Sequence, residues 1–538
     1  METLYFNGDI LTMEDDQKTV EAVLVSDGKI CAVGNYDVLL SQKSAECVLY
    51  DLQGKTLMPS FLDGHSHFTQ TAQFMNCADL SGAESFADIV EILKNFMLER
   101  DLTHGEHIVG YGYDHNFLKE KTHPDKHVLD EVSKDFPVMI WHASSHMGVV
   151  NSKTLELTGL LETPNLENGV IGRYPGTQEP TGFLEEAAMR PAKCLANPQK
   201  QDMAELLVKA QELYLANGIT TVQDGASTNE KIKEIRAVGS LHQLKVDVVT
   251  YPCLLTDDVQ SIMKTHADCV HQYVDHVKIG GYKILLDGSP QGKTAWLSQP
   301  YENSGEYKGY PWLTEQQAHM FVKQAIEDNM QLLAHCNGDA ASQQFIDVYE
   351  EELASSQNPT KNLLRPVMIH CQTVREDQLE RMKAIDMIPS IFVAHIWYWG
   401  DIHLRNLGVY RANRISPVKS ALTKGLMYNF HTDTPVVPPN MLHSVWAAVN
   451  RITRGGTLLS SEQCVDVYAA LKGITINTAY AYFEEEKKGS IKEGKQADLV
   501  ILDNNPLKVD KMDIQKIQVL ATIKDGVMVY KNHDTTEQ

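Results

Sequence analysis

The stretch LMPSFLDGHSHF, residues 57–68, decides the fold prediction. Its apolar run is followed by two histidines, His65 and His67. On an extended strand, residues i and i+2 point to the same face, so these two imidazoles can bind one metal ion. An isolated pair of this kind is weak evidence, because the chain holds 21 histidines. The alternative interpretation is a partly exposed loop pair.

Through the middle of the chain, short apolar runs alternate with helical patterns, which is typical of βα units. We predict an α/β fold built on a (β/α)8 TIM barrel, with strands at 56–63, 218–224, 245–251, 281–287, 331–335, 366–370, 387–393 and 426–431. The gap between the first two strands is longer than one helix needs. Residues 70–205 are therefore predicted to form an inserted lid subdomain over the mouth of the barrel.

The two ends of the chain have a different pattern. Residues 1–57 and 487–538 alternate short apolar runs with turn dipeptides such as NG and DG, which predicts strands joined by tight turns. We expect both ends to pair into one small composite β-sandwich domain. Residues 58–486 are then left for the barrel and its insertion.

The composition argues against several classes of partner. The 48 basic and 71 acidic residues give a net charge of −23, whereas nucleic acid and anionic membrane surfaces need a basic face. No apolar run reaches the length of a membrane span, and the nine cysteines include no CxxC pair that would indicate a zinc ribbon. We expect a cytoplasmic protein with a small-molecule substrate. Its oligomeric state stays open, with a homodimer as one alternative.

Three predicted strands end at residues that bind metals. His335 ends the run QLLAH, His370 ends PVMIH, and Asp433 follows LMYNFH by two residues. Barrel strands deliver their carboxyl ends to one shared mouth, and neutral imidazoles and carboxylates suit Zn²⁺ and similar ions. A single histidine at a strand end is more often hydrogen-bonded scaffolding. Three such ends together with the first histidine pair predict a metal centre.

One lysine lies inside an apolar strand. In GYKILLD, alternation places Lys283, Leu285 and Asp287 on one face. A lysine in such a strand is costly unless it is neutral or paired. One interpretation is a salt bridge from Lys283 to Asp287 or another acid. The other is an amine of lowered pKa that takes up CO₂ as a carbamate and bridges two metal ions.

Taken together, these motifs resemble the amidohydrolase superfamily, and more narrowly its branch containing N-substituted formamide deformylase and the YtcJ-like proteins. The resemblance covers nearly the whole chain and rests on LMPSFLDGHSHF, GYGYDHN, HASSHMGVVNS, GYKILLDGSPQGKTAWL, LLAHCNGDAA, MIHCQ, FHTDTPVVPPN and ADLVILDNNP, in that order. It implies one or two divalent ions, with Zn²⁺ expected, held by His65, His67, carbamylated Lys283, His335, His370 and Asp433.

Two positions depart from the family pattern. Ser60 stands where relatives usually have glycine, and we expect little effect because the residue is still small. Lys293 stands where relatives often carry arginine. This second departure makes it unsafe to transfer a relative's substrate to this chain.

Further residues are predicted to contact the substrate. The resemblance suggests that the GYGYDHN and HMGVVNS segments approach the metal, and aromatic side chains commonly line small-molecule sites. The predicted substrate contacts are Asp114, His115, His146, Asn151, Trp296 and His395. The alternatives are structural: polar loop residues usually satisfy backbone groups, and a tryptophan is more often part of the core.

These residues predict a metal-dependent hydrolase, and the resemblance implies that it acts on the C–N bond of an amide, an N-substituted formamide or a cyclic amide. A bound metal brings the pKa of water from 15.7 towards about 7. Asp433 is the predicted catalytic residue, taking up the proton of the water and returning it to the leaving amine. One alternative is an esterase or another hydrolase on the same site. Another is a non-catalytic scaffold, in which ligands would be lost, whereas here all six positions are filled.

Overall fold

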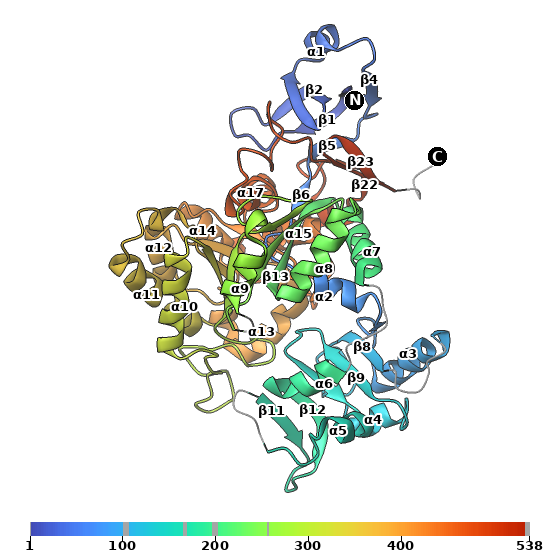
Figure 1. The fold of residues 1–538 in the computed structure, drawn as a ribbon, viewed down its shortest axis with the longest axis vertical. Helices are drawn as coiled ribbons and strands as arrows, with labels where there is room; N and C mark the ends of the chain where they lie inside the picture. The colour runs from blue at the N-terminus through green and yellow to red at the C-terminus, as the bar shows by residue number, and fades with distance from the viewer. Residues whose placement is uncertain (1, 101–106, 165–168, 196–202, 256–257, 533–538) are drawn as a thin grey trace. The chain divides into compact units, whose positions relative to one another are not determined.

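A computed structural model describes residues 2–100, 107–164, 169–195, 203–255 and 258–532 (Figure 1). Parts of the predicted insertion and the last residues of the predicted C-terminal β segment lie outside these ranges. The chain divides into two compact units. Unit 1 contains residues 1–69 and 207–538, and unit 2 contains residues 70–206.

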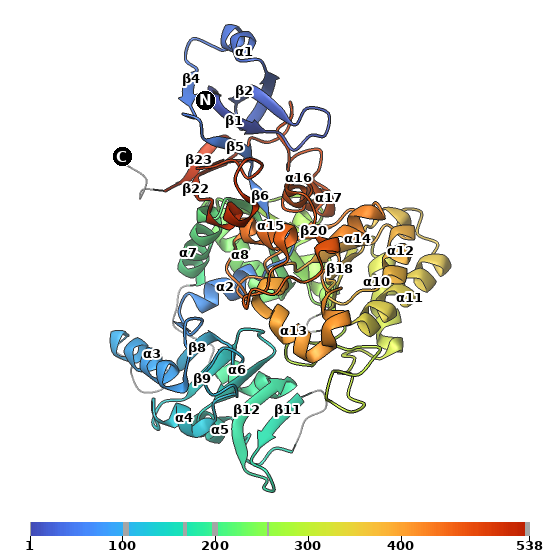
Figure 2. The ribbon, with the colours of Figure 1, turned by 180° about the vertical axis from the view of Figure 1, so that it is seen from behind.

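Strands from both ends of the chain share one sheet in unit 1. Figures 1 and 2 both show the blue N-terminal strands next to the red C-terminal ones. The order is β23-β22-β21-β5-β1-β2-β3, and β4 pairs with β1. The strands are β1 (Glu2–Leu11), β2 (Thr19–Ser26), β3 (Lys29–Gly34), β4 (Val48–Asp51), β5 (Thr56–Pro59), β21 (Leu499–Leu502), β22 (Val519–Lys524) and β23 (Val527–Lys531). Buried apolar side chains from both ends, such as Val23, Leu57 and Ile523, form one core.

Two parallel sheets form the centre of unit 1. The first has the order β15-β14-β13-β6 and the second β16-β17-β18-β19-β20. Their strands are β6 (Phe61–Leu62), β13 (Ile219–Ser227), β14 (Asp247–Pro252), β15 (Val277–Ile279), β16 (Gly281–Leu285), β17 (Gln331–Cys336), β18 (Val367–His370), β19 (Ile388–Ile391) and β20 (Asn429–Phe430). These strands are almost entirely buried, as expected for parallel sheets covered on both faces. The observed strands overlap all eight predicted runs.

Hydrogen bonds link the two parallel sheets at both seams. Leu254 N, next to β14, donates to Lys283 O of β16 at 3.0 Å, and Gly64 N, after β6, donates to Phe430 O of β20 at 3.2 Å. A Cβ on Gly64 would lie 2.7 Å from that same carbonyl oxygen, so the second seam requires glycine. Across the two sheets, the parallel strands from β6 to β20 are therefore arranged in chain order. The protein has mixed α/β content.

Helices alternate with the parallel strands. They are α7 (Met203–Ala216), α8 (Asn229–Ser240), α9 (Val259–Thr265), α10 (Glu315–Glu327), α11 (Asp339–Ser355), α12 (Glu376–Ala384), α13 (His395–Ala412), α14 (Val418–Thr423), α15 (Met441–Asn450), α16 (Val467–Lys472) and α17 (Ile476–Ala481). In α10, a capping box of Thr314 and Gln317 begins the helix, and Ala318, Val322 and Ile326 bury one face, the spacing expected of an amphipathic helix. Among the helices that the structure describes, none has the length and hydropathy needed to cross a membrane.

The predicted first strand, 56–63, is two strands. Thr56–Pro59 is β5 and pairs with β21, whereas Phe61–Leu62 is β6 and pairs with β13. The chain changes sheets at Ser60, whose N–H donates to Asp498 O at 2.9 Å, while the next amide, Phe61 N, donates to Gly218 O at 2.8 Å. An apolar run alone does not show this change of partner, because all residues from 56 to 62 are buried in either sheet.

Unit 2 has its own six-stranded sheet, of order β11-β12-β10-β9-β8-β7. Its strands are β7 (Ala78–Asp79), β8 (Ile108–Tyr113), β9 (Val138–His142), β10 (Met147–Val150), β11 (Gly169–Arg173) and β12 (Pro180–Glu186). Its helices are α3 (Phe86–Glu99), α4 (Lys126–Asp130), α5 (Ser152–Thr158) and α6 (Arg190–Leu195), and α2 (Phe68–Phe74) spans the boundary between the units. Two apolar clusters, one around Ile89 and Leu93 and the other around Leu155 and Met189, form its core.

Candidate metal centre

The predicted ligands lie on or just after parallel strands of unit 1. His65 and His67 follow β6, and Asp433 follows β20. Lys283 lies within β16, His335 lies near the end of β17, and His370 ends β18. The two flanking ligand loops are tied together by their backbones, because Asp433 N donates to His65 O at 2.9 Å and His67 N to Thr434 O at 2.8 Å.

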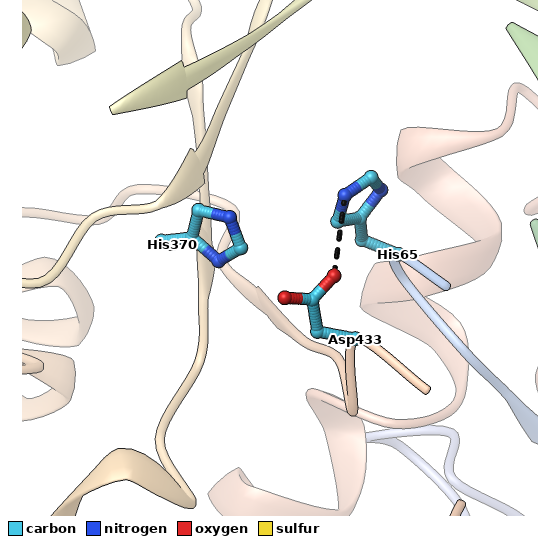
Figure 3. Close-up of side chains that lie close together, drawn as sticks. All are labelled: His65, His370 and Asp433. Atoms are coloured by element: carbon cyan, nitrogen blue, oxygen red, sulfur yellow. Dashed lines mark ion pairs between the residues drawn. The ribbon is translucent and has the colours of Figure 1, made fainter. Parts of the chain in front are cut away.

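His65, His370 and Asp433 form the centre of this group (Figure 3). All three are buried, and one ligand atom from each lies within 4.8 Å of the others. Oδ1 of Asp433 is 3.6 Å from His65 Nε2 and 3.3 Å from His67 Nε2. Ligand atoms around a tetrahedral Zn²⁺ are about 3.3 Å apart, since each bond is about 2.0 Å long. The spacing therefore fits a bound cation.

The oxygen of Asp433 that faces the imidazoles gives a further test of this fit. Asp433 Oδ1 is buried and has no hydrogen-bond partner in the part of the chain that the structure describes. A buried carboxylate oxygen left in this way is costly unless a cation or a donor reaches it. A divalent ion between Asp433 Oδ1 and the two Nε2 atoms would remove that cost.

Lys283 lies against the same histidine. Its Nζ is 3.1 Å from His65 Nε2, and burial lowers its pKa to about 8, although Asp433 favours the charged form. Asp287, the predicted salt-bridge alternative, accepts backbone N–H groups from Trp296, Asn337 and Gly338 at 2.7 to 3.0 Å. Burial therefore makes Lys283 easier to deprotonate than an ordinary lysine, and the neutral amine is the form that can react with CO₂.

A chain of imidazoles extends from the centre. His335 Nδ1 lies 3.0 Å from His370 Nε2, and His370 Nδ1 lies 3.1 Å from His431 Nε2. His431 Nδ1 in turn lies 2.9 Å from Ser390 Oγ. Burial holds the pKa of His370 well below its ordinary value and lowers that of His431 to about 3. Both rings are therefore neutral at physiological pH, as metal ligands must be.

Sequence reasoning missed the residues that orient the ligands. Gln223 of β13 accepts from His65 Nδ1 and donates to Gly64 O at 3.1 Å. His67 Nδ1 donates to Gly225 O at 2.7 Å. Such partners fix the tautomer and direct Nε2 towards the metal position. Gln223 could have been suspected, because it is a polar residue near the end of a predicted strand.

Two further features shape the ligand loops. A Cβ on Gly225 would lie 2.4 Å from His65 Cε1, so glycine is needed where β13 passes the ring. Asp63 accepts from the backbone amides of His65 at 3.2 Å and Thr432 at 3.1 Å. Burial raises the pKa of Asp63 to about 7. Through these two hydrogen bonds, the Asp63 carboxyl group links the loop after β6 to the loop after β20.

Two of the predicted substrate contacts belong to unit 1. His395 begins α13 and is buried, with Nδ1 3.0 Å from His403 Nε2 and its ring 4.5 Å from that of Trp399. Trp296 is half-buried, and its backbone N–H donates to Asp287 Oδ2 at 2.9 Å.

The other four belong to unit 2. Asp114 and His115 follow β8 and lie close to His142. His146 Nδ1 lies 3.0 Å from Glu186 Oε1. Asn151 begins α5 as its N-cap, accepting from Thr154 N at 2.9 Å and donating to Ser133 O at 2.9 Å. These contacts give Asn151 a structural role in unit 2, and its contact with substrate stays a prediction.

Comparisons with known proteins agree on one family. A family model described as "Amidohydrolase family" matches residues 48–530. The chain is 27% identical to the N-substituted formamide deformylase of Arthrobacter pascens, covering 98% of each protein, and 26% identical to the YtcJ protein of Bacillus subtilis (strain 168), covering 99% of this chain and 100% of that one. It also resembles the crystal structure of an uncharacterized metal-dependent hydrolase from Pyrococcus horikoshii OT3, with a TM-score of 0.76, 25% identity, and coverage of 95% of this chain and 99% of that one.

Proposed function

The chain belongs to the amidohydrolase family and is a hydrolase, and from this premise we propose that it cleaves a C–N bond. The substrate class is an amide, an N-substituted formamide or a cyclic amide. The observation that carries the proposal is the buried Oδ1 of Asp433, which lacks a hydrogen-bond partner among the described residues and faces the Nε2 atoms of His65 and His67.

The proposed ligands are His65, His67, Lys283, His335, His370 and Asp433. They would hold one or two divalent ions, with Zn²⁺ favoured by the imidazole and carboxylate donors. When bound, such an ion polarises a carbonyl group and makes water more acidic. Lys283 is the candidate for carbamylation, because it lies 3.1 Å from His65 Nε2 and burial lowers the pKa of its amine to about 8. The proposal includes closure of the two parallel sheets into one (β/α)8 barrel, with the ligands at its mouth.

Asp433 is proposed as the general base and acid. It takes the proton from the attacking water and delivers it to the leaving nitrogen, since an amide anion leaves poorly without protonation. His395 and Trp296 are proposed substrate contacts within unit 1. Unit 2 is proposed as a lid that supplies the remaining predicted substrate contacts. A cytoplasmic location is proposed because the nine cysteines of the sequence include no CxxC pair.

The first experiment compares Asp433→Asn with the exposed-site control Asp513→Asn. Metal-loaded proteins are assayed against N-substituted formamides, acylated amino acids, cyclic amides and esters. We expect Asp433→Asn to lose about 10²- to 10⁴-fold in kcat, the usual contribution of general acid–base catalysis, and the control to keep its activity. Near-normal turnover of Asp433→Asn at matched metal content would reject the role of Asp433.

The same panel separates the alternatives. Hydrolysis of esters with no cleavage of any C–N substrate would favour the esterase alternative. A purified metal-free protein that resists reconstitution with Zn²⁺ and Mn²⁺ would favour the non-catalytic scaffold.

A further inference from the structure

A second group of potential metal ligands lies in unit 2, which no proposed catalytic step uses. β8 and β9 are neighbouring parallel strands, and Tyr113 pairs with His142 where they end. Asp114 and His115 follow directly after β8. The carboxyl ends of these two strands therefore bring one carboxylate and two imidazoles together, as parallel strands do in known ligand sites.

The separations of the three ligand atoms match the size of a metal ion. His115 Nδ1 lies 3.2 Å from His142 Nε2, and Asp114 Oδ1 lies 3.4 Å from His142 Nε2 and 3.8 Å from His115 Nδ1. The circle through three atoms at these separations has a radius of about 2.0 Å, the usual length of Zn–N and Zn–O bonds. One ion can thus reach all three atoms with little movement of the side chains.

The surroundings hold the ligand atoms in place. Asp114 Oδ1 accepts from the backbone amide of Asn116 at 2.8 Å and from its side-chain amide at 2.9 Å. Asp114 and His142 are both buried. The ring of His123 lies 3.9 Å from that of His115 and 5.7 Å from that of His142, so it packs against both imidazoles.

His142 can present the nitrogen that a metal needs. Its Nδ1 lies 2.9 Å from Ser144 Oγ, which can accept a hydrogen bond, and accepts a hydrogen bond from the Ser144 amide at 3.0 Å. The amide favours a proton on Nε2 in the metal-free chain. Binding of a cation at Nε2 would move this proton to Nδ1, which would then donate a hydrogen bond to the serine hydroxyl. The change is one of tautomer and leaves the charge of the ring unchanged.

We propose that Asp114, His115 and His142 form a second divalent-cation site, separate from the amidohydrolase centre. Two imidazoles and one carboxylate suit Zn²⁺ and related first-row ions, and three protein ligands leave a position for water or another small ligand. This gives Asp114 and His115 a different role from the substrate contact predicted from the sequence.

Zinc stoichiometry of the full chain tests the proposal without any substrate. Protein stripped with a chelator is reloaded with Zn²⁺, dialysed and measured by elemental analysis. We expect Asp114→Asn and His142→Ala each to bind about one equivalent less than the wild type. The matched control His127→Ala, an exposed histidine of the same unit, should bind as much as the wild type. Thermal unfolding checks that the variants are folded. Asp114→Asn is the more conservative variant, because asparagine has nearly the same shape as aspartate.

A variant of the other centre separates this proposal from the proposed function. In a His65→Ala, His67→Ala background, the second site should still bind zinc, and adding Asp114→Asn should remove it. Equal zinc content in the wild type, Asp114→Asn and His142→Ala would overturn the second site and leave the catalytic proposal standing. Loss of zinc in these variants, with none lost from the His65/His67 variant, would support the second site and count against the catalytic centre.

Discussion

Unit 1 contains two buried polar clusters that satisfy their charges in different ways. The candidate metal centre gathers imidazoles around one lysine and one aspartate. A second cluster, the ionic cluster, contains three lysines and three acids: Asp247, Lys278, Glu484, Lys488, Asp498 and Lys524. All six are at least nine-tenths buried. Asp247 of this cluster is the first residue of β14, whereas the candidate ligands other than Lys283 lie at or after the carboxyl ends of their strands.

Each lysine of the ionic cluster forms an ion pair with at least one acidic side chain. Lys278 and Glu484 are in contact, and Lys488 lies 2.9 Å from Glu484. Lys524 lies 3.1 Å from Asp247 and 3.2 Å from Asp498. Burial opposes these charges, but Lys488 and Lys524 hold the pKa of Asp247 well below its ordinary value.

The ionic cluster and the candidate metal centre differ in what balances their charges. The ionic cluster balances its charges internally and needs no ligand. In the candidate metal centre, Asp433 Oδ1 lacks a hydrogen-bond partner among the described residues and faces imidazole nitrogens of His65 and His67 at 3.6 and 3.3 Å. In the ionic cluster, Glu484 Oε2 and Asp498 Oδ2 also lack a hydrogen bond, but each lies close to a lysine Nζ, at 2.9 and 3.2 Å. Removing a charge should therefore destabilise the first cluster and change binding at the second.

The largest expected loss of stability follows from Asp247→Asn. The variant leaves Lys488 and Lys524 with less countercharge in a buried site, and breaking a buried pair in this way costs about 3–5 kcal/mol. Urea unfolding of metal-free protein measures the free energy. The control Glu327→Gln breaks an exposed pair with Lys323, for which about 0–1 kcal/mol is expected. Equal effects of the two substitutions would contradict the distinction between the clusters.

Two buried lysines, Lys278 and Lys283, should respond in opposite ways to replacement by methionine. Lys278→Met leaves Glu484 with Lys488 as its remaining partner, so we expect a loss of about 3 kcal/mol in the free energy of unfolding and normal metal content. Lys283→Met should weaken metal binding at least about tenfold and stabilise the metal-free chain.

Elemental analysis measures the metal content of both variants, and urea unfolding measures their free energy of unfolding. Partial recovery of metal binding in Lys283→Ala with a short carboxylate would support the carbamate. Unchanged metal stoichiometry in Lys283→Met would reject a ligand role for this lysine.

The pH dependence of stability should distinguish Lys283 from Lys524 of the ionic cluster. Burial lowers the pKa of Lys283 from 10.5 to about 8, so between these pH values the unfolded chain binds the extra proton. The free energy of unfolding of metal-free protein should then rise with pH across this window, by up to about 3 kcal/mol relative to Lys283→Met. Lys524 behaves in the opposite sense: although burial disfavours its charge, Asp247 and Asp498 raise its pKa well above 10.5. Its stabilisation is therefore complete below that pH.

The sequence pointed to five of the six candidate metal ligands because each lies at or just after the end of an apolar run, whereas Lys283 was noticed as a charge inside one. The family resemblance was confirmed by the match to residues 48–530 and by the relatives, and the mixed α/β content was confirmed as well. His431 was missed because its role depends on His370 of another strand. The ionic cluster was missed because Lys488 and Asp498 lie in loops, where charged residues are usually exposed. The domain boundaries, the closed barrel, the site roles and the lid stay predictions.

The smallest expected effect is at Ser60, where the chain passes from the terminal sheet to the parallel sheet. Its hydroxyl lies 2.6 Å from that of Thr220, and both residues are buried. Ser60→Ala should cost about 1 kcal/mol, because it leaves the Thr220 hydroxyl without this hydrogen bond. Adding Thr220→Val should restore most of the loss, since both polar partners are then gone. Purely additive losses in the two substitutions would show that the hydrogen bond does not join the sheets, whereas coupling would show that it does.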